Sequence, residues 1–463
     1  MALPKPVGRQ HEVVYLPSKG HQVVLGTAGS GKTSMAILRA ALLSNAAFPG
    51  SGKTLLITFN NTLSSYLRFL AADVIDAVTV ENFHKFARGY LGSRDEMTGS
   101  SILPTSRYTK LVEEAVLHVA QKHDPHAFFS RPTAFFKEEI RWLSRHAITT
   151  EAGYIAVERT GRADARMPRS LRPTMWQIRE RYRALRAEAG YAYDVDEIAV
   201  DVEQALNGDS QPRLYRHVII DEGQDLSPAM LRALSKAVPV DGSLTLFGDV
   251  AQQIYGRQMS WRSAGLNPVK IWQFEENYRN TKAIAKLAVA VSQMPYYSGE
   301  ADLVVPKQPA ADGPKPTLVS CKDEATEFAF VERLALDASK SGSVAILTRT
   351  NSQARAFQKS MSAARQLHDT MSAWTDGPGI SIGTLHNGKG LEFDTVILPH
   401  LSDDQFPHPL AVENDGPEEA AAVEGRLLYV GITRARSALL LTFCGQRTAL
   451  LPIDPSLYAE ISR

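Results

Sequence analysis

The sequence predicts an α/β fold with more than one lobe, and three observations support this prediction. A glycine-rich loop lies between an apolar segment and a good helix former near residue 26. A second apolar segment ends in two adjacent carboxylates at residue 221, and further alternation of strand-like and helix-like segments follows from residue 271. The chain has 463 residues, which is enough for about two to four domains.

Composition limits the class of protein but does not define its function. Hydrophobic residues make up 44% of the chain and charged residues 22%, as in ordinary globular proteins. The net charge is only +1, so any nucleic-acid binding must come from a local basic surface. The first ten residues lack the apolar centre of a signal peptide, and no run approaches the ~20 apolar residues of a membrane helix. Cys321 and Cys444 lack metal-ligand spacing, so we expect no disulfide, zinc or iron–sulfur site, and a cytoplasmic location.

The first candidate site is the glycine-rich loop. An apolar strand expected at 21–25 is followed by GTAGSGKT at 26–33 and by a helix former at 34–43. The pattern GxxxxGK[ST] between a strand and a helix is a P-loop, whose backbone N–H groups surround phosphate. We expect Gly26, Gly29 and Gly31 to shape the loop. Lys32 would reach the β- and γ-phosphates of a nucleotide, and Thr33 would bind Mg²⁺. The alternative is a chance glycine-rich turn.

A second GSGKT segment at 50–54 provides an internal control. It has Ala47 in place of the leading glycine, and it precedes an apparent strand at 55–59 where a P-loop follows one. We therefore predict a loop with Lys53 in solvent.

The second candidate site is the acidic strand end. The apolar segment 217–220 leads into Asp221 and Glu222, at the position where nucleotide sites form in parallel sheets. Asp221 would hold Mg²⁺, and Glu222 would orient and deprotonate the attacking water. The alternative is a solvated turn. Kinases, GTPases and transporters share both features, so further motifs must decide between them.

Further motifs resemble those of the UvrD/Rep group of superfamily 1 helicases, in the same order, from about residue 10 to residue 436. They are LLITFNN at 55–61, NFH at 82–84, DEGQD at 221–225, LFGDVAQQIYG at 246–256, ENYR at 276–279, GTLHNGKGLEF at 383–393 and EGRLLYVGITRA at 424–435. The resemblance implies two RecA-like P-loop lobes, with a mostly helical accessory domain, called 1B, inserted in the first.

The resemblance also implies roles in ATP hydrolysis between the two lobes. Gln252 would sense the γ-phosphate, and Arg279 and Arg434 would act as arginine fingers from the second lobe, an effect worth about 10³–10⁵ in rate. The alternative for these arginines is a surface salt bridge. Of the other arginines in this region, Arg426 is expected to be structural and Arg436 to be solvated.

The nucleoside part of ATP would be held by three further residues. The resemblance implies that Tyr278 stacks on adenine and that Glu392 approaches the ribose. Gln10 lies at roughly the family's distance before the P-loop and would read the adenine edge, although its neighbours match poorly. The cofactors implied are ATP and Mg²⁺.

Single-stranded DNA would lie across both lobes, where aromatic side chains can stack on bases of any sequence. The candidates for these contacts are Phe59, Asn60, Phe83, His84, Tyr255, Trp261 and His386. Core packing is the alternative for Phe59 and Trp261, and a structural hydrogen bond is the alternative for the two histidines.

The strongest basic region is 139–190, which holds eleven arginines against six acidic residues. Four aromatic residues, Trp142, Tyr154, Trp176 and Tyr182, are interleaved with them. We favour a nucleic-acid surface here over a solvated helical face. Segment 402–424 carries seven acidic residues and no lysine or arginine, so it should avoid DNA.

The expected domains are the first lobe at 1–84 and 208–270, the helical domain 1B at 85–207, and the second lobe, 2A, at 271–463. The family's second accessory domain, 2B, is expected to be absent or reduced to a short loop near 366–379. That loss would put autonomous duplex unwinding in doubt.

The resemblance implies a DNA helicase or single-strand translocase that moves 3′ to 5′. The alternative is a DNA-stimulated ATPase switch that regulates a partner without travelling. No fused nuclease is expected, since fewer than thirty residues follow the last motif. A compact chain of this kind resembles the helicase-like subunit of anti-phage systems such as Gabija, in which a separate nuclease is the partner.

Overall fold

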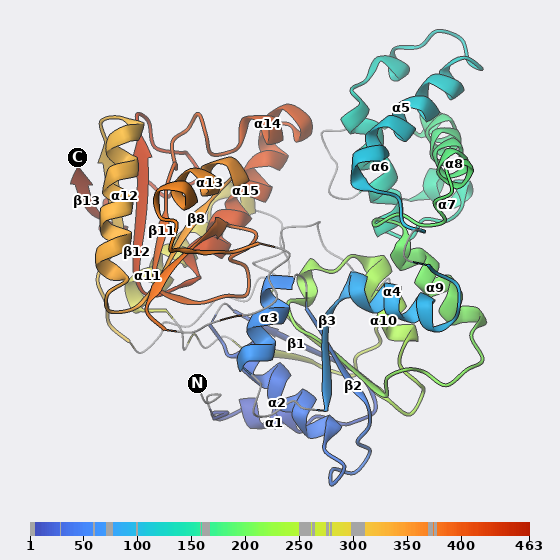
Figure 1. Cartoon of the computed structure of the whole chain (residues 1–463), viewed down its shortest axis with the longest axis horizontal. Coiled ribbons are helices and arrows are strands. Elements are labelled where there is room, and N and C mark those ends of the chain that lie inside the picture. The colour runs from blue at the N-terminus through green and yellow to red at the C-terminus, as the bar shows by residue number, and fades with distance from the viewer. Residues whose placement is uncertain are drawn as a thin grey trace.

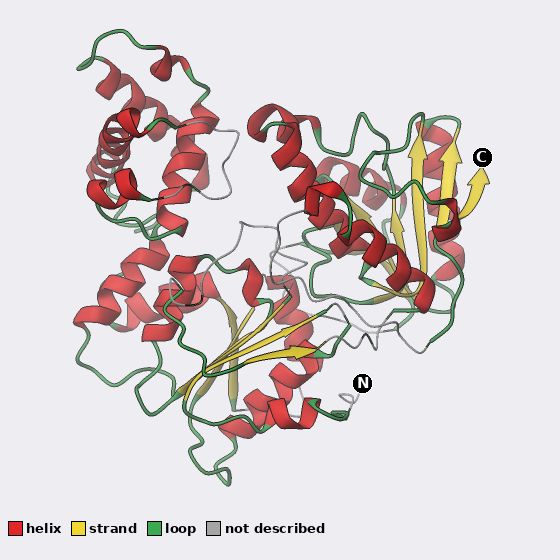
Figure 2. Ribbon diagram, turned by 180° about the vertical axis from the view of Figure 1, so that it is seen from behind, coloured by secondary structure: helices red, strands yellow, loops and turns green. Residues whose placement is uncertain are grey.

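The computed structural model forms two parallel β-sheet lobes and a separate helical unit (Figures 1 and 2). It describes residues 5–27, 29–58, 61–70, 77–98, 101–157, 159, 167–249, 261, 264–274, 277, 280–297, 311–368, 374 and 377–463. The helical unit stands apart from both sheets at one corner of the molecule (Figure 1).

The first lobe is a six-stranded parallel sheet in the order β3-β2-β4-β5-β1-β6. Its strands are β1 (Gly20–Gly26), β2 (Thr54–Thr58), β3 (Val78–Asn82), β4 (His217–Ile220), β5 (Ser243–Gly248) and β6 (Ile271–Phe274). Helices α1 (Gln10–Val14), α2 (Lys32–Ser44) and α3 (Asn61–Leu70) share an apolar core with one face of this sheet. The other face is covered by α4 (Phe83–Ser93), α9 (Ile198–Gly208) and α10 (Pro228–Lys236). The central strands β2, β4 and β5 are buried along their whole length, as expected where helices cover both faces of a parallel sheet.

The second GSGKT segment is a loop, as predicted. It precedes β2, and the Lys53 side chain is exposed, with its ammonium 4.9 Å from the centre of the Tyr215 ring.

The lobe boundaries differ from the expected ones at two places. Strand β6 pairs in parallel with β1, with Val23 opposite Ile271, so the first lobe continues past residue 270. Helices α4 and α9 belong to the core of the first sheet and not to the insertion, because their apolar side chains pack on Ile57 and Ile220. The independent helical core is therefore shorter than the expected 85–207.

The helical insertion has a core of its own, formed by residues between Leu103 and Tyr191. It contains α5 (Thr105–Ala120), η1 (Ala127–Ser130), α6 (Thr133–Arg145), α7 (Glu151–Ala156), η2 (Arg169–Leu171) and α8 (Arg172–Glu188). The chain enters and leaves it side by side, because Ile102 and Tyr193 form a parallel bridge.

The second lobe is a seven-stranded parallel sheet in the order β13-β7-β12-β11-β8-β10-β9. Its strands are β7 (Thr317–Cys321), β8 (Ser343–Thr348), β9 (Arg365–Gln366), β10 (Gly379–Thr384), β11 (Phe393–Leu398), β12 (Ala435–Cys444) and β13 (Ala459–Ser462). Its helices are α11 (Lys282–Ser292), η5 (Pro295–Tyr297), α12 (Glu324–Ala338), α13 (Asn351–Ser360), α14 (Pro409–Asp415), α15 (Pro417–Ile432) and η6 (Pro455–Leu457). Across the described residues of 311–384, every helix and strand is part of this lobe. Among the helices that the structure describes, none is long and apolar enough to cross a membrane.

Candidate nucleotide site between the lobes

The P-loop connects the end of β1 to the start of α2, as the sequence predicts. Gly29 and Gly31 have φ angles of +79° and +83°, a region that side chains with a Cβ rarely adopt. A Cβ on Gly31 would lie 2.8 Å from Nε2 of Gln10, and a Cβ on Gly26 would lie 2.5 Å from Oγ of Ser30. The three glycines are therefore required both by backbone conformation and by space.

Lys32 turns back over this loop. Its Nζ donates to the carbonyl oxygens of Gly26 at 2.8 Å and Thr27 at 2.7 Å, and it lies 3.8 Å from Oδ2 of Asp249. The ammonium is nearly buried, so its charge acts in a medium of low polarity. Phosphate oxygens can replace such carbonyl acceptors, which suits Lys32 to a phosphate contact.

Thr33 and Asp221 lie together, although they are far apart in sequence. Thr33 Oγ1 donates to Asp221 Oδ2 at 2.9 Å, while Asp221 Oδ1 is buried without a hydrogen-bond partner in the described part of the chain. A hydroxyl and a carboxylate with an unused oxygen are hard oxygen ligands, the kind that Mg²⁺ prefers. These two residues therefore fit a magnesium ion.

Glu222 lies next to Asp221 in the left-handed backbone region, with φ of +55°. Burial alone would raise the pKa of Glu222, but the charges of Lys389, Lys32 and Arg434 outweigh it and hold the pKa below its ordinary value. In Asp221 the balance is reversed, because burial and the neighbouring Glu222 raise its pKa. A carboxylate that stays ionised in a buried site can accept a proton from water.

The second lobe completes the site with Lys389 and Arg434. Lys389 Nζ forms a buried ion pair with Oδ1 of Asp225, the last residue of DEGQD, across the gap between the lobes. Burial raises the pKa of Asp225 to about 7, against the opposing effect of Lys389. Arg434 is buried at the end of α15, and its positive charge reaches both Glu222 and Asp225. Two positive groups of one lobe thus act on the acidic strand end of the other.

Of the residues expected to hold the nucleoside, the structure describes Gln10 and Glu392. Gln10 Nε2 donates to Ser30 O at 2.9 Å, and its Oε1 accepts from the Val7 N–H at 2.9 Å, so the amide is tied to the P-loop. Glu392 is paired with Arg436, whose Nε lies 3.1 Å from Oε2. Arg436 is therefore not simply solvated, as expected, because a carboxylate lies beside it. Arg426 is buried, in agreement with a structural role.

Of the predicted DNA contacts, the structure places Phe83 elsewhere. The Phe83 side chain is only 1% exposed and belongs to the core between α4 and the first sheet, so it has no free face for a base. Trp261 is partly buried against the same core. Burial, with Arg349 and Lys389 nearby, lowers the pKa of His386 to about 4, and burial also lowers the pKa of His84. Both histidines would therefore meet a phosphate as neutral donors.

Several predicted site residues lie outside the described residues. They are Phe59, Asn60, Gln252, Tyr255, Tyr278 and Arg279.

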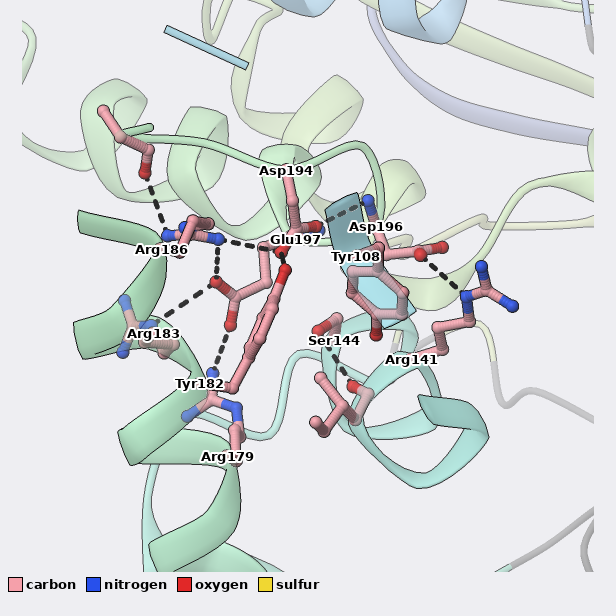
Figure 3. A network of polar contacts seen from close by, with 12 residues as sticks. Tyr108, Arg141, Ser144, Arg179, Tyr182, Arg183, Arg186, Asp194, Asp196 and Glu197 are labelled. Carbon is pink, nitrogen blue, oxygen red and sulfur yellow. Dashed lines mark hydrogen bonds and ion pairs between the residues drawn. The ribbon is translucent and has the colours of Figure 1, made fainter. Parts of the chain in front are cut away.

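Contrary to our expectation, many of the described arginines of this segment form a structural network and do not lie on an open basic surface (Figure 3). Arg186 Nη1 lies 2.8 Å from both Asp194 Oδ2 and Glu197 Oε2, and Arg179 Nη2 lies 2.8 Å from Glu197 Oε1. Tyr182 also donates to Asp194 at 2.8 Å. Asp194 and Glu197 lie just beyond the segment whose charges we counted, so the local count did not include them.

Other arginines and aromatic residues of the segment are also used internally. Arg159 Nη2 lies 2.6 Å from the buried Glu139, and Arg172 Nη1 donates to three main-chain carbonyls. The aromatic side chains expected to be interleaved on a surface are largely in the helical core: Trp142, Tyr154 and Tyr182 are buried, and Trp176 is partly buried against them.

Two important residues were missed by the sequence interpretation, Lys389 of the cross-lobe ion pair and Arg349. Arg349, directly after β8, donates through Nε and Nη2 to the carboxylate of Glu424, at 2.6–2.8 Å. Glu424 has no exposed side-chain surface, so it needs a cationic partner. The pair ties β8 to α15, the helix that leads to Arg434. An acidic residue at the start of the mostly apolar segment 424–432 was the signal that could have indicated it.

Taken together, the P-loop, the acidic end of β4 and the cross-lobe lysine and arginine define a two-lobed P-loop ATPase. The chain belongs to the UvrD/Rep helicase family: the UvrD/REP helicase N-terminal domain matches residues 8–279, and the UvrD-like helicase C-terminal domain matches residues 364–446. It is therefore an ATP-hydrolysing enzyme of the DNA helicase class.

Individual relatives are similar over different lengths. ATP-dependent DNA helicase UvrD2 of Mycobacterium tuberculosis is 24% identical over 563 aligned residues, which cover 95% of this chain and 79% of the relative. DNA helicase II of Rickettsia typhi is 44% identical over 71 residues, 15% of this chain and 11% of that protein. The C-terminal domain of a possible DNA helicase from Lactobacillus plantarum, a solved structure, covers 40% of this chain and 98% of its own, with 22% identity. Its TM-score of 0.29 is too low to carry an argument.

Proposed function

We propose that this protein is an ATP-driven motor that moves along single-stranded DNA in the 3′ to 5′ direction. The observation that carries the proposal is the composite site, in which Lys389 and Arg434 of the second lobe act on the acidic strand end of the P-loop lobe. Such a site depends on how the lobes are placed, so hydrolysis and lobe movement are coupled.

In this proposal the described residues divide the chemistry of hydrolysis among them. Lys32 binds the phosphates of ATP, and Thr33 and Asp221 hold Mg²⁺, which neutralises phosphate charge when bound. Glu222 orients the attacking water and takes its proton. Arg434, together with Arg279, stabilises the charge that develops on the transferred phosphoryl group.

The remaining assignments are supported by the family alone. Gln252 would sense the γ-phosphate, and Tyr278, Glu392 and Gln10 would hold the nucleoside. The DNA would cross both lobes, past Phe59, Asn60, Tyr255 and the two histidines, His84 and His386.

We also propose that the family's 2B domain is absent or reduced here. The alignment with UvrD2 is longer than this chain, so that relative carries insertions that this chain lacks. The described elements of 311–384 are accounted for by the second lobe. Translocation does not need that domain, and duplex unwinding is the activity that its loss would affect.

The test is ATP hydrolysis by the purified protein with and without single-stranded DNA, with Lys32→Ala as the inactive control. Displacement of streptavidin from 3′- or 5′-biotinylated oligonucleotides then reports movement and its direction. Faster release from the 5′ end, dependent on ATP and lost in Lys32→Ala, is the expected result. DNA-stimulated hydrolysis without any release would instead support a stationary switch that regulates a partner such as a nuclease. Hydrolysis that ignores DNA would contradict both functions.

A further inference from the structure

Asn280 joins the connection between the two lobes to the segment that carries Arg434. It lies shortly after β6, the last strand of the first sheet, and directly before α11 of the second lobe. Its side-chain Nδ2 donates to the carbonyl oxygens of Ala435 at 2.5 Å and Thr433 at 3.3 Å. These two carbonyls belong to the residues on either side of Arg434.

The orientation of this amide is fixed from its other side by Asn277. Asn277 Nδ2 donates to Asn280 Oδ1 at 2.8 Å, and Asn277 Oδ1 accepts from the main-chain N–H of Asn280 at 3.1 Å. Asn280 is only 1% exposed, so water cannot substitute for these partners. An amide that donates to two carbonyls and accepts from a third group cannot be replaced by a carboxylate or an apolar side chain without losing hydrogen bonds.

Several hydrogen bonds hold Arg434 within its own lobe. Its Nε donates to Val430 O at 3.0 Å, its Nη2 donates to Thr433 Oγ1 at 3.0 Å, and its carbonyl accepts from the Phe393 N–H at 3.0 Å. The position of the Arg434 side chain therefore depends on the position of the main chain around residues 430–434. Asn280 joins the main chain at Thr433 and Ala435 to Asn277, which lies in the connection between the lobes.

We propose that Asn280 is a positioning residue for Arg434. By bonding to the carbonyls on both sides of Arg434, it fixes that arginine relative to the segment that carries Arg279, its neighbour in sequence. The inference rests on the proposed function, in which Arg434 acts on the transferred phosphoryl group.

The test is Asn280→Asp, which keeps the shape of the side chain but replaces the two donated hydrogen bonds with repulsion between oxygens. We expect kcat for DNA-stimulated ATP hydrolysis to fall about tenfold or more, because a small displacement of a catalytic group is costly. The KM for ATP should stay within about twofold, since the loss is confined to the transition state. Asn207→Asp, at an exposed asparagine of α9, is the control for added charge and should match the parent.

A double-mutant cycle with Arg434→Gln separates positioning from a general effect on folding. If Asn280 acts through Arg434, adding Asn280→Asp to Arg434→Gln lowers kcat no further. Binding of a fluorescent non-hydrolysable ATP analogue and thermal unfolding identify any variant that has not folded. Independent losses that multiply in the double variant would overturn the proposal, as would a fully active Asn280→Asp protein. An inactive parent would instead contradict the proposed function, and an undiminished Arg434→Gln would contradict the arginine-finger role.

Discussion

At the scale of single residues, the charge on Glu222 is decided by groups from both lobes. Its burial favours the neutral acid, whereas Lys32 of the first lobe and Lys389 and Arg434 of the second favour the carboxylate. The carboxylate prevails, and the pKa of Glu222 lies below its ordinary value. The cationic groups of the second lobe therefore help to keep this base ionised when they lie near it.

Replacing Glu222 with Gln should stop the chemical step while preserving nucleotide binding. The amide keeps the size of the side chain but cannot take a proton from water, so we expect kcat for ATP hydrolysis to fall about 10²–10⁴-fold. Filter binding of labelled ATP should be close to that of the parent. The exposed Glu151→Gln is the matched control. Loss of ATP binding in Glu222→Gln would show that the residue is structural.

The sequence predicted the P-loop and its acidic partner because their chemistry depends on contiguous residues. Gly29, Gly31 and Lys32 form one loop whose conformation follows from the pattern itself. Phe83 is different, because its burial depends on α9, which lies more than one hundred residues away in the chain. No local pattern distinguishes an aromatic ring that meets a base from one that meets another helix. For this reason the DNA contacts remain predictions.

At the scale of elements, a buried ionic network joins α8 of the insertion to the turn that starts α9 of the first lobe (Figure 3). Arg179, Arg183 and Arg186 lie on one face of α8 and converge on Glu197. Ion pairs of this kind require specific geometry, so they fix the direction in which the insertion leaves the lobe. A sequence count of charges cannot detect this, because it does not show which charges face each other.

Asp201 is the poorly satisfied member of this network, and it makes stability depend on pH. Burial and the charge of Glu197 raise its pKa from 3.8 to about 7, and its Oδ2 is buried without a partner among the described residues. Neutral Asp201 contributes its full stability below pH 3.8. This contribution falls as the pH rises and is lost above about pH 7. Asn does not titrate. Asp201→Asn should therefore gain stability over the parent from pH 5 to pH 8, by on the order of 2–3 kcal/mol.

Urea unfolding at pH 5 and at pH 8 measures this change, with the exposed Asp124→Asn as control. An advantage for Asp201→Asn that is constant with pH, or that shrinks toward pH 8, would show that Asp201 is ionised in the folded protein.

At the scale of the whole molecule, the two lobes touch at a second place besides the Lys389–Asp225 ion pair. Thr62 Oγ1 of α3 donates to the carbonyl of His368 at 3.0 Å, and the ring centres of Tyr66 and Trp374 lie 5.1 Å apart. A Cβ on Gly390 would lie 2.7 Å from Leu63, so glycine allows the close approach there. The sequence predicted two lobes, but not these contacts, because each depends on how two separately folded surfaces meet.

The Lys389–Asp225 ion pair should help to hold the two lobes together. We expect the lobes to separate more when only Lys389 is replaced than when both residues are replaced. Both side chains are at most 2% exposed, so removing Lys389 leaves Asp225 buried without its ionic partner, at a cost of about 3–5 kcal/mol. Lys389→Met should therefore favour separated lobes, with a larger radius of gyration in small-angle X-ray scattering. Asp225→Asn added to Lys389→Met removes the unpaired charge and should restore much of the parent value. If the double variant is as open as Lys389→Met alone, the unpaired Asp225 is not what separates the lobes, and the second contact controls closure.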